Sequence, residues 1–349
     1  MTCTCRIVPP RLLRRIAERG SPQQRAAALG TLATDQTLRL GRATYQLLEN
    51  GAHKALMSAG ESTRQRTVYD AGGGDALPGR AVRNEDDGPS RDVAVDEAFD
   101  GLGATFDFYR DVLDRNSIDD EGLHLDATVH YGEKYDNAFW NGQQMVFGDG
   151  DGDLFNRFTI SLDIIGHELT HGVTGDEAGL VYIGQPGALN ESISDVFGSL
   201  VKQYARRQDA ASADWLIGAG LFTAHVHGVA LRSMKAPGTA YDDPVLGRDP
   251  QPATMDGYVH TSADEGGVHT NSGIPNRAFY LLAVALGGHA WEKAGRIWYE
   301  TLRDRRLKPT ATFRQFARLT ALNADHFFGK AERAATTSAW AEVGVKANG

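Results

Sequence analysis

Apolar residues recur every three to four positions along several stretches of this chain, a pattern that predicts amphipathic helices. The clearest helical stretches are residues 93–113, 275–286, 291–302 and 312–327. Shorter apolar runs near glycine and aspartate predict strands, at residues 67–70, 125–131 and 144–147. The predicted strands therefore lie in the first half of the chain and most helices in the second, which is an α+β pattern.

A further helical stretch, residues 162–173, carries His167, Glu168 and His171 among apolar neighbours. Histidines four positions apart lie on one helical face, so both imidazoles can reach one metal ion. The glutamate lies about 100° around the helix and can hold a water molecule. An exposed polar face is the alternative interpretation. The apolar neighbours argue against it, because a buried histidine needs a polar partner or a metal.

A second periodic helix is predicted from Leu189 to about residue 206, and it begins with acidic residues. Glu191 and Asp195 are four positions apart and share a face. A turn-rich link at residues 172–187 would let this helix fold back against the first. Glu191 would then complete the three-ligand set of a catalytic zinc, with Asp195 and Asn190 as partners of the ligands. The alternative is an acidic pair favoured by the helix dipole.

These motifs resemble those of the thermolysin family of zinc endopeptidases. The similar stretches, in the same order, are NAFWN (137–141), HELTH (167–171), ALNESISDVFG (188–198), LRSM (231–234) and DEGGVHTNSG (264–273). The resemblance covers about residues 65–345. It implies a two-lobed zincin fold with a mixed, β-rich N-terminal lobe, a mainly α-helical C-terminal lobe and the active-site cleft between them. It also implies one catalytic Zn²⁺, held by His167, His171 and Glu191.

The resemblance implies a role for each polar residue near the zinc. Glu168 would take a proton from the attacking water and deliver it to the leaving amine. His269, oriented by Asp264, would stabilise the developing oxyanion, and Tyr182 would be the second donor. For His269 taken alone, a surface loop histidine is the alternative interpretation.

The same resemblance implies where a peptide substrate binds. Asn137 and the backbone of Ala138 would pair with an extended peptide. Arg232 would hold a substrate carbonyl, with a structural salt bridge as the alternative. The pocket on the leaving-group side would be lined by Phe155, Phe158, Ile164, Ile217, Leu221 and Leu231. All six are apolar, so cleavage before bulky hydrophobic residues is expected, although each would also suit the core.

The first 50 residues differ in charge from the rest of the chain, at +5 against −14. Helices are predicted at residues 11–18 and 34–49, the first of them following two prolines in the stretch 7–13. This stretch resembles the short propeptide of protealysin-like members of the family. The resemblance implies that the chain's own propeptide lies across the cleft in cis and is removed by self-cleavage. Opposite charges would favour its docking, and a flexible basic tail is the alternative.

Three parts of the chain are therefore expected: a propeptide with its cleavage linker (1–57), an N-terminal catalytic lobe with the zinc helix (58–174) and a mainly helical C-terminal lobe (175–349). Self-cleavage is expected before Leu56 or Met57, which are large apolar residues in a polar linker. Cys3 and Cys5 are the only cysteines. A thiolate from one of them is a hypothetical ligand for the open zinc position.

One part of the family pattern is broken. Asp163 and Asp214 match carboxylate ligands of the family's paired calcium site, but acidic ligands are also expected where this chain has Lys202, Leu216 and Ala219. An ammonium group cannot replace a carboxylate as a cation ligand. We therefore expect the paired calcium site to be lost and Lys202 to pair with Asp163. The aspartate-rich residues 149–153 are interpreted as a turn, with a calcium site as the alternative.

Charge and hydropathy narrow the possible partners and location. A formal net charge of −9 argues against a nucleic-acid partner, and no apolar run reaches the ~18 residues that span a membrane. The first 20 residues contain no apolar signal-peptide core. We therefore expect a monomer that acts on protein or peptide substrates after secretion by a non-classical route, with action in the cytoplasm as the alternative.

Two other functions compete with the endopeptidase. A zinc aminopeptidase would need an acidic cluster to hold a free amine, and no clear one is visible in the sequence. A non-catalytic binding protein with the zincin fold would have no use for Glu168, His269 and Tyr182 together, and all three are present. The sequence therefore favours the endopeptidase.

Overall fold

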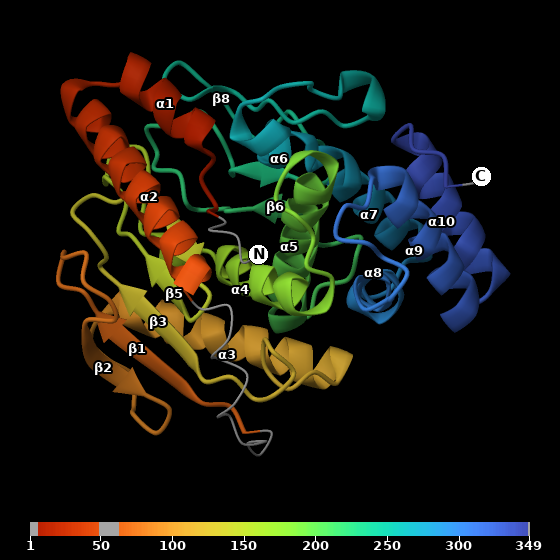
Figure 1. Ribbon diagram of the computed structural model, residues 1–349, viewed down its shortest axis with the longest axis horizontal. Coiled ribbons are helices and arrows are strands. Elements are labelled where there is room, and N and C mark those ends of the chain that lie inside the picture. Colours follow the sequence, from red (N-terminus) through yellow and green to blue (C-terminus); the bar gives the residue numbers. More distant parts are fainter. Residues whose placement is uncertain (1–5, 49–62, 348–349) are drawn as a thin grey trace.

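The computed structural model of the chain describes residues 6–48 and 63–347, and for residues 39–48 it describes the backbone alone. The first half of the body (residues 63–347) holds a five-stranded sheet in the order β2-β1-β3-β5-β4 (Figure 1). Its strands are β1 (Arg66–Asp70), β2 (Arg80–Asn84), β3 (Leu125–Val129), β4 (Ala138–Trp140) and β5 (Gln144–Phe147). The three inner strands run parallel, and β2 and β4 pair antiparallel to them at the two edges. Strand β4 therefore offers an edge to which a further extended segment can pair.

Helix α3 (Val93–Leu113) packs against β1 and β3. The side chain of Asp92 caps its start by accepting two backbone N–H groups of the first turn. Asp114, in the left-handed conformation, ends it. The predicted bounds of this helix are confirmed, because the cap and the apolar periodicity are both local signals.

Helices α4 (Leu162–Glu177) and α5 (Gly184–Ala205) form the centre of the molecule (Figure 1). They approach closely at Gly198, where an added Cβ atom would lie 2.3 Å from the carbonyl oxygen of Asp163. Residues 178–183 alone separate the two helices, so the turn-rich link predicted for 172–187 is wrong at both ends. Glycine favours a turn locally, but packing of the two helices against each other outweighs that propensity.

The C-terminal lobe is mainly helical. Its helices are α6 (Asp264–Asn271), α7 (Gly273–Leu286), the π-helix η3 (Trp291–Gly295), α8 (Arg296–Leu302), α9 (Phe313–Phe327) and α10 (Lys330–Glu342). The predicted helices are present, and the one at 291–302 is divided into η3 and α8. Helix α10 is not predicted, because its single large apolar residue, Trp340, gives no periodic apolar stripe. Tertiary packing holds this helix, since Trp340 stacks on Trp298 with ring centroids 5.8 Å apart.

Short elements connect these helices. Two-stranded sheets pair β6 (Leu216–Ile217) with β7 (Arg232–Ser233) and β8 (Asp242–Asp243) with β9 (Gly247–Arg248). The 3₁₀ turns are η1 (Phe158–Ile160) and η2 (Met255–Gly257). Every helix in the described part of the chain is too short or too polar to cross a membrane.

Residues 6–48 form an N-terminal segment that packs on the body (Figure 1). It contains α1 (Pro10–Arg19), close to the predicted 11–18, and α2 (Pro22–Leu48), which begins well before the predicted residue 34. The early start reflects Pro22, because proline suits the first turn of a helix. The apolar residues of the segment join the core of the body: Ile7, Val8, Leu12, Leu13, Ile16 and Ala28. Cys3, Cys5, Leu56 and Met57, on which the thiolate and self-cleavage hypotheses depend, lie outside the described residues.

Candidate active site and metal centre

The two histidines of α4 and one glutamate of α5 converge. His167, His171 and Glu191 each offer one ligand atom, and these atoms lie within 4.8 Å of one another. The two histidine Nε2 atoms are 3.1 Å apart, and each lies 3.5 Å from an oxygen of Glu191. All three side chains are buried. This arrangement provides the three protein ligands of a catalytic metal centre.

Hydrogen bonds from neighbouring polar groups orient the imidazole rings of these ligands. The Nδ1 atom of His167 lies 2.8 Å from Asp195 Oδ1, and that of His171 lies 2.8 Å from Asn190 Oδ1 and 3.0 Å from Ser194 Oγ. Because both Nδ1 atoms have partners, both Nε2 atoms are left for the metal. Among the described residues, Glu191 Oε2 is buried with no hydrogen-bond partner. A buried carboxylate oxygen facing two imidazole nitrogens fits Zn²⁺.

Glu168 lies beside this centre in a fully buried position. Its Oε2 atom accepts a hydrogen bond of 3.1 Å from the backbone N–H of Trp140, and its Oε1 atom is buried without a hydrogen-bond partner in the described chain. Burial, together with the charge of Glu191, raises the pKa of Glu168 well above its usual value. A carboxylate with a raised pKa can both accept and return a proton near neutral pH.

His269 approaches the centre from α6. Its Nδ1 atom lies 2.6 Å from Asp264 Oδ1, and its Nε2 atom lies 3.3 Å from Tyr182 Oη and 3.5 Å from Glu191 Oε2. Burial alone would lower the pKa of His269, but Asp264 and Glu191 raise that pKa to about 10. The imidazole is therefore a cation at neutral pH. Tyr182 donates a hydrogen bond to Glu191 Oε1.

An unusual backbone turn brings Asp264 to His269. Residues 264–267 all have positive φ, between 48° and 87°. Two of the four are glycines, which adopt this conformation without the cost that a Cβ atom brings. The turn places Asp264 so that its carboxylate also accepts the backbone N–H of His269 at 3.0 Å. The pair of glycines in the sequence therefore serves to position the histidine.

An extended strand of the same chain already pairs with the edge strand β4. Arg6 bridges Phe139 in antiparallel fashion, and Ile7 N–H donates to the carbonyl of Ala138 at 3.3 Å. Val8 donates its N–H to Asn137 Oδ1 at 3.0 Å and accepts from Asn137 Nδ2 at 3.3 Å. The two residues expected to bind an extended substrate thus bind residues 7 and 8.

Arg232 forms the structural salt bridge of the alternative interpretation and also contacts a backbone carbonyl of the N-terminal segment. Its Nε and Nη2 atoms donate to Asp195 at 2.9 and 2.8 Å, and its Nη1 atom donates to the carbonyl of Ile7 at 3.1 Å. Burial by itself would raise the pKa of Asp195, but Arg232 and His167 hold it well below its usual value. Asn276 donates a further hydrogen bond to Asp195, at 2.8 Å. Asn276 cannot be predicted from the sequence, because no local pattern connects it with α5.

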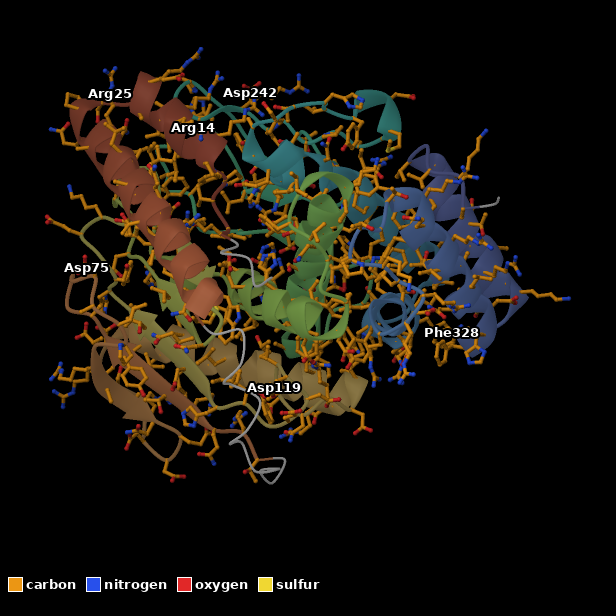
Figure 2. The ribbon with its side chains drawn as sticks, viewed as in Figure 1. Arg14, Arg25, Asp75, Asp119, Asp242 and Phe328 are labelled. Carbon is orange, nitrogen blue, oxygen red and sulfur yellow. The ribbon has the colours of Figure 1, made fainter. Side chains whose placement is uncertain are left out.

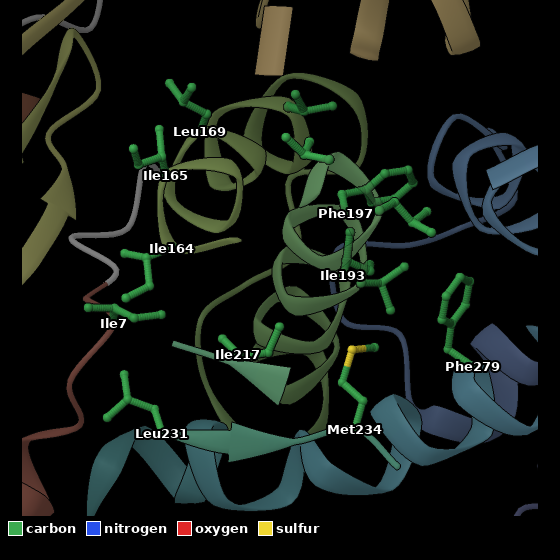
Figure 3. Close-up of a cluster of buried hydrophobic side chains, with 14 of the residues drawn as sticks. Ile7, Ile164, Ile165, Leu169, Ile193, Phe197, Ile217, Leu231, Met234 and Phe279 are labelled. Atoms are coloured by element: carbon green, nitrogen blue, oxygen red, sulfur yellow. The ribbon is translucent and has the colours of Figure 1, made fainter. Parts of the chain in front are cut away.

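The six apolar residues expected to line the leaving-group pocket are all buried. Figure 3 shows Ile7 beside Ile164 and Leu231. Ile217 is paired with Arg232 in the small sheet. Phe155 contacts Phe158 and Phe222 instead, with ring centroids 5.9 and 5.7 Å apart. The six residues are therefore continuous with the general core, and Ile7 belongs to the same apolar cluster.

Comparison with known proteins matches three family models along the chain. Residues 5–33 match the protealysin propeptide, residues 28–175 the catalytic domain of thermolysin metallopeptidase, and residues 178–345 its alpha-helical domain. An extracellular metalloprotease of Pectobacterium carotovorum subsp. carotovorum is 54% identical over 342 residues, which cover 98% of this chain and 96% of the relative. The chain belongs to the thermolysin family of metallopeptidases.

Two further relatives support this membership. The protease PrtS of Photorhabdus sp. (strain Az29) is 49% identical over 97% of this chain and 92% of its own. The solved structure of the precursor of protealysin, a metalloproteinase from Serratia proteamaculans, superimposes with a TM-score of 0.89 at 55% identity, over 98% of this chain and 99% of that chain. The predicted fold class and family are confirmed. As a thermolysin-family member with a propeptide, the protein is a zinc-dependent endopeptidase made as a zymogen, and the aminopeptidase and binding-protein alternatives are not favoured.

At Asp163 and Asp214, where the resemblance predicts that a calcium pair is lost, this chain has a buried ion cluster. Lys202 Nζ lies 2.7 Å from Asp163 Oδ2, 2.8 Å from Asp214 Oδ1 and 2.7 Å from the carbonyl of Leu216. Burial would lower the pKa of Lys202, but Asp163 and Asp214 raise it, so the lysine stays charged. The predicted pair of Lys202 and Asp163 is present. Asp151 Oδ1 accepts three backbone N–H groups of residues 153–155, so the stretch 149–153 contains the predicted turn.

Proposed function

We propose that the protein cleaves internal peptide bonds before bulky hydrophobic residues, with the zinc held by His167, His171 and Glu191. The observation that carries this proposal is the convergence of these three buried side chains, with Glu168 and the cationic His269 beside them. When bound, Zn²⁺ supplies Lewis acidity that polarises the scissile carbonyl and lowers the pKa of water.

The chain's own residues perform the remaining steps. Glu168 accepts the proton of the attacking water and returns it to the leaving amine, for which its raised pKa suits it. His269, oriented by Asp264, donates to the oxygen on which negative charge develops. Tyr182, which contacts both His269 and Glu191, is the second donor.

The substrate is held by the groups that hold residues 6–8 in the structure. Asn137 and the backbone of Ala138 pair with an extended peptide, and Arg232 binds the carbonyl of the residue after the scissile bond. The side chain of that residue enters the apolar region lined by Phe155, Phe158, Ile164, Ile217, Leu221 and Leu231. The position of Ile7 beside Ile164 and Leu231 supports this assignment (Figure 3).

We further propose the division into a propeptide with its linker (1–57), an N-terminal catalytic lobe (58–174) and a helical lobe (175–349). The family matches that end at residue 175 and begin at residue 178 support the second boundary. The name of the Pectobacterium relative supports action outside the cell. We propose that the protein is secreted by a non-classical route and acts as a monomer.

The test is casein digestion by the purified protein and by the Glu168→Gln variant, with and without a zinc chelator. Loss of the general base should lower kcat/KM at least about 10³-fold, whereas bound zinc, measured by metal analysis, should stay at one ion per chain. The matched control is Glu121→Gln, which changes an exposed glutamate and should keep full activity. A chelated preparation that digests casein at the original rate would contradict the proposal.

A further inference from the structure

Residues 6–8 lie in the active site in the register of a substrate. The carbonyl oxygen of Arg6 is 3.0 Å from His269 Nε2, the group proposed to stabilise the oxyanion. The carbonyl of the next residue, Ile7, accepts a hydrogen bond from Arg232. Both the N–H and the carbonyl of Val8 are hydrogen-bonded to the side chain of Asn137. The peptide bond that an active site attacks is the one whose carbonyl faces the oxyanion donor. In this chain that bond joins Arg6 to Ile7.

We propose that the Arg6–Ile7 peptide bond is an internal substrate, hydrolysed by the active site that it occupies. Water adds across the C–N bond: the Arg6 carbonyl carbon gains the water oxygen and becomes a carboxylate, and the Ile7 nitrogen gains both water protons and becomes an ammonium group. No reactant other than water is required. This inference rests on the proposed function and assigns it a processing site within the N-terminal segment itself.

A buried ion pair holds the Arg6 half of this bond. The Arg6 side chain is 1% exposed, and its Nε lies 2.9 Å from Asp35 Oδ1 on α2. Its Nη2 also donates to the backbone carbonyl of Asp35. The Asp35 carboxylate accepts two further hydrogen bonds, from Tyr135 Oη at 2.6 Å and from Asn137 Nδ2 at 3.3 Å. We call the contact of Arg6 with Asp35 the clasp.

The clasp lies on one side of the scissile bond and the substrate-binding groups on the other. The Ile7 half is held by Ala138, Asn137 and Arg232, as described above. Hydrolysis breaks none of these contacts, so both new chain ends stay in the cleft after the cut. The strength of the clasp sets how long the Arg6 end stays against His269, whereas the Ile7 end keeps Asn137 and Arg232 occupied until the N-terminal segment leaves the body.

The first experiment follows the full chain by intact mass and N-terminal sequencing during incubation with zinc, with casein digestion measured in parallel. The expected result is a species that begins at Ile7 in the original protein and is missing in Glu168→Gln. Casein digestion without any chain beginning at Ile7 would overturn this inference and leave the proposed function intact. Failure to digest casein would count against the proposed function as well.

The second experiment weakens the clasp. Asp35→Asn should increase the rate at which the fragment ending at Arg6 is released about tenfold, because a charge-assisted pair is lost. The control is Gln24→Ala, which removes another hydrogen bond between the N-terminal segment and the body, from Gln24 Nε2 to Asp153 at 2.7 Å. Equal release rates in the two variants would overturn the role of the clasp.

A third measurement does not depend on the folding of any variant. The self-processed enzyme is given an acetylated synthetic peptide with the sequence of residues 6–13, RIVPPRLL, which lacks Asp35. We expect two products, acetyl-arginine and a peptide that begins at Ile7, from a single cut of the Arg6–Ile7 bond. A peptide that inhibits casein digestion and remains intact would show a non-productive register and overturn the proposal.

Discussion

Glu168 and His269 show how burial and neighbouring charge set the chemistry of single side chains. Burial raises the pKa of Glu168, and Glu191 adds to that rise. Burial opposes protonation of His269, yet Asp264 and Glu191 raise its pKa to about 10. Glu168 can therefore be protonated near neutral pH, while His269 remains a cation. Neither state follows from residue type alone.

His130 allows a test of the same principle far from the active site. Its Nδ1 lies 2.8 Å from Asp149 and its Nε2 lies 3.0 Å from Asp92. The hydrogen bond to Asp149 is the main cause that raises its pKa to about 9. Because the folded-state pKa lies above the unfolded value of about 6.5, the stabilisation is complete below pH 6.5. It is lost as the pH rises through about 9.

We therefore expect His130→Asn to lower the free energy of unfolding at pH 6 by about 1–2 kcal/mol, a figure reduced for the partial exposure of both aspartates. Asparagine is chosen because it tolerates the positive φ of this position, 54°. The measurement is urea unfolding at pH 6 and pH 10, in the Glu168→Gln background to prevent self-digestion. A destabilisation of equal size at both values would refute the electrostatic explanation.

At the scale of elements, the metal centre depends on how closely α4 and α5 approach. Glycine at position 198 permits this approach, because a Cβ atom there would lie 2.3 Å from Asp163 O and 2.9 Å from His167 N. Real Cβ contacts are not that short, so any side chain would push the helices apart. The ligands on the two helices would then separate. Gly198 thus keeps the metal ligands close together although it is not itself a ligand.

Gly198→Ala should lower zinc affinity at least about tenfold and destabilise the protein by about 1–3 kcal/mol. The matched control is Gly175→Ala on α4, where nothing lies within 4 Å of the new Cβ atom. That change should stabilise the helix by about 0.5–1 kcal/mol. Chelator competition and urea unfolding measure both quantities. Unchanged zinc affinity in Gly198→Ala would show that the helices can separate without cost to the site.

Lys202 connects the same two helices to the strand β6. Lys202→Met leaves Asp163 buried without its cation, so we expect a loss of about 3–5 kcal/mol in unfolding free energy. Lys293→Met is the control: it breaks an exposed pair with Glu332 and should cost less than about 1 kcal/mol. Because the ammonium group lies among the carboxylates, added calcium should not raise the melting temperature of the original protein. A clear calcium-dependent increase would contradict this account.

At the scale of the whole molecule, the N-terminal segment docks mainly through apolar packing and backbone pairing. Its buried side chains belong to the same core as those of both lobes. Among the described residues, its polar contacts with the body include the hydrogen bonds of Gln24 with Asp153 and of Thr31 with the N–H of Asp136. By contrast, Arg14 and Arg25 lie exposed on the outside of the segment (Figure 2). These two charges therefore lie outside the docked face of the segment.

We expect Leu13→Ala to weaken docking by about 2–5 kcal/mol, since Leu13 is fully buried. Casein-digesting activity should then appear earlier after purification than in the original protein. Arg14→Ala, at the neighbouring exposed position, should change the time course less than about twofold, because an exposed charge contributes little. If the arginine variant activated faster than the leucine variant, charge and not apolar packing would dominate docking.

Much of the fold could be predicted because its signals are local. The bounds of α3 follow from a cap and a periodicity within one stretch, and the histidine pair of α4 needs only the geometry of one helix. The link between α4 and α5 and the last helix, α10, could not be predicted in this way. Packing of α4 against α5 outweighs the glycine content of the link, and α10 has one large apolar residue, Trp340, whose stacking partner Trp298 lies on another helix.

The sequence by itself determined the chemistry of the site: two imidazoles and a carboxylate with the right spacing, a glutamate beside them, and the family to which such motifs belong. Only the tertiary structure decided which other residues of the chain contact that site. It gave Arg232 both Asp195 and the carbonyl of Ile7 as partners, and it placed the Arg6–Ile7 bond against His269. Two of these contacts join residues more than 200 positions apart. No local pattern encodes them, because they arise only when separate elements pack together.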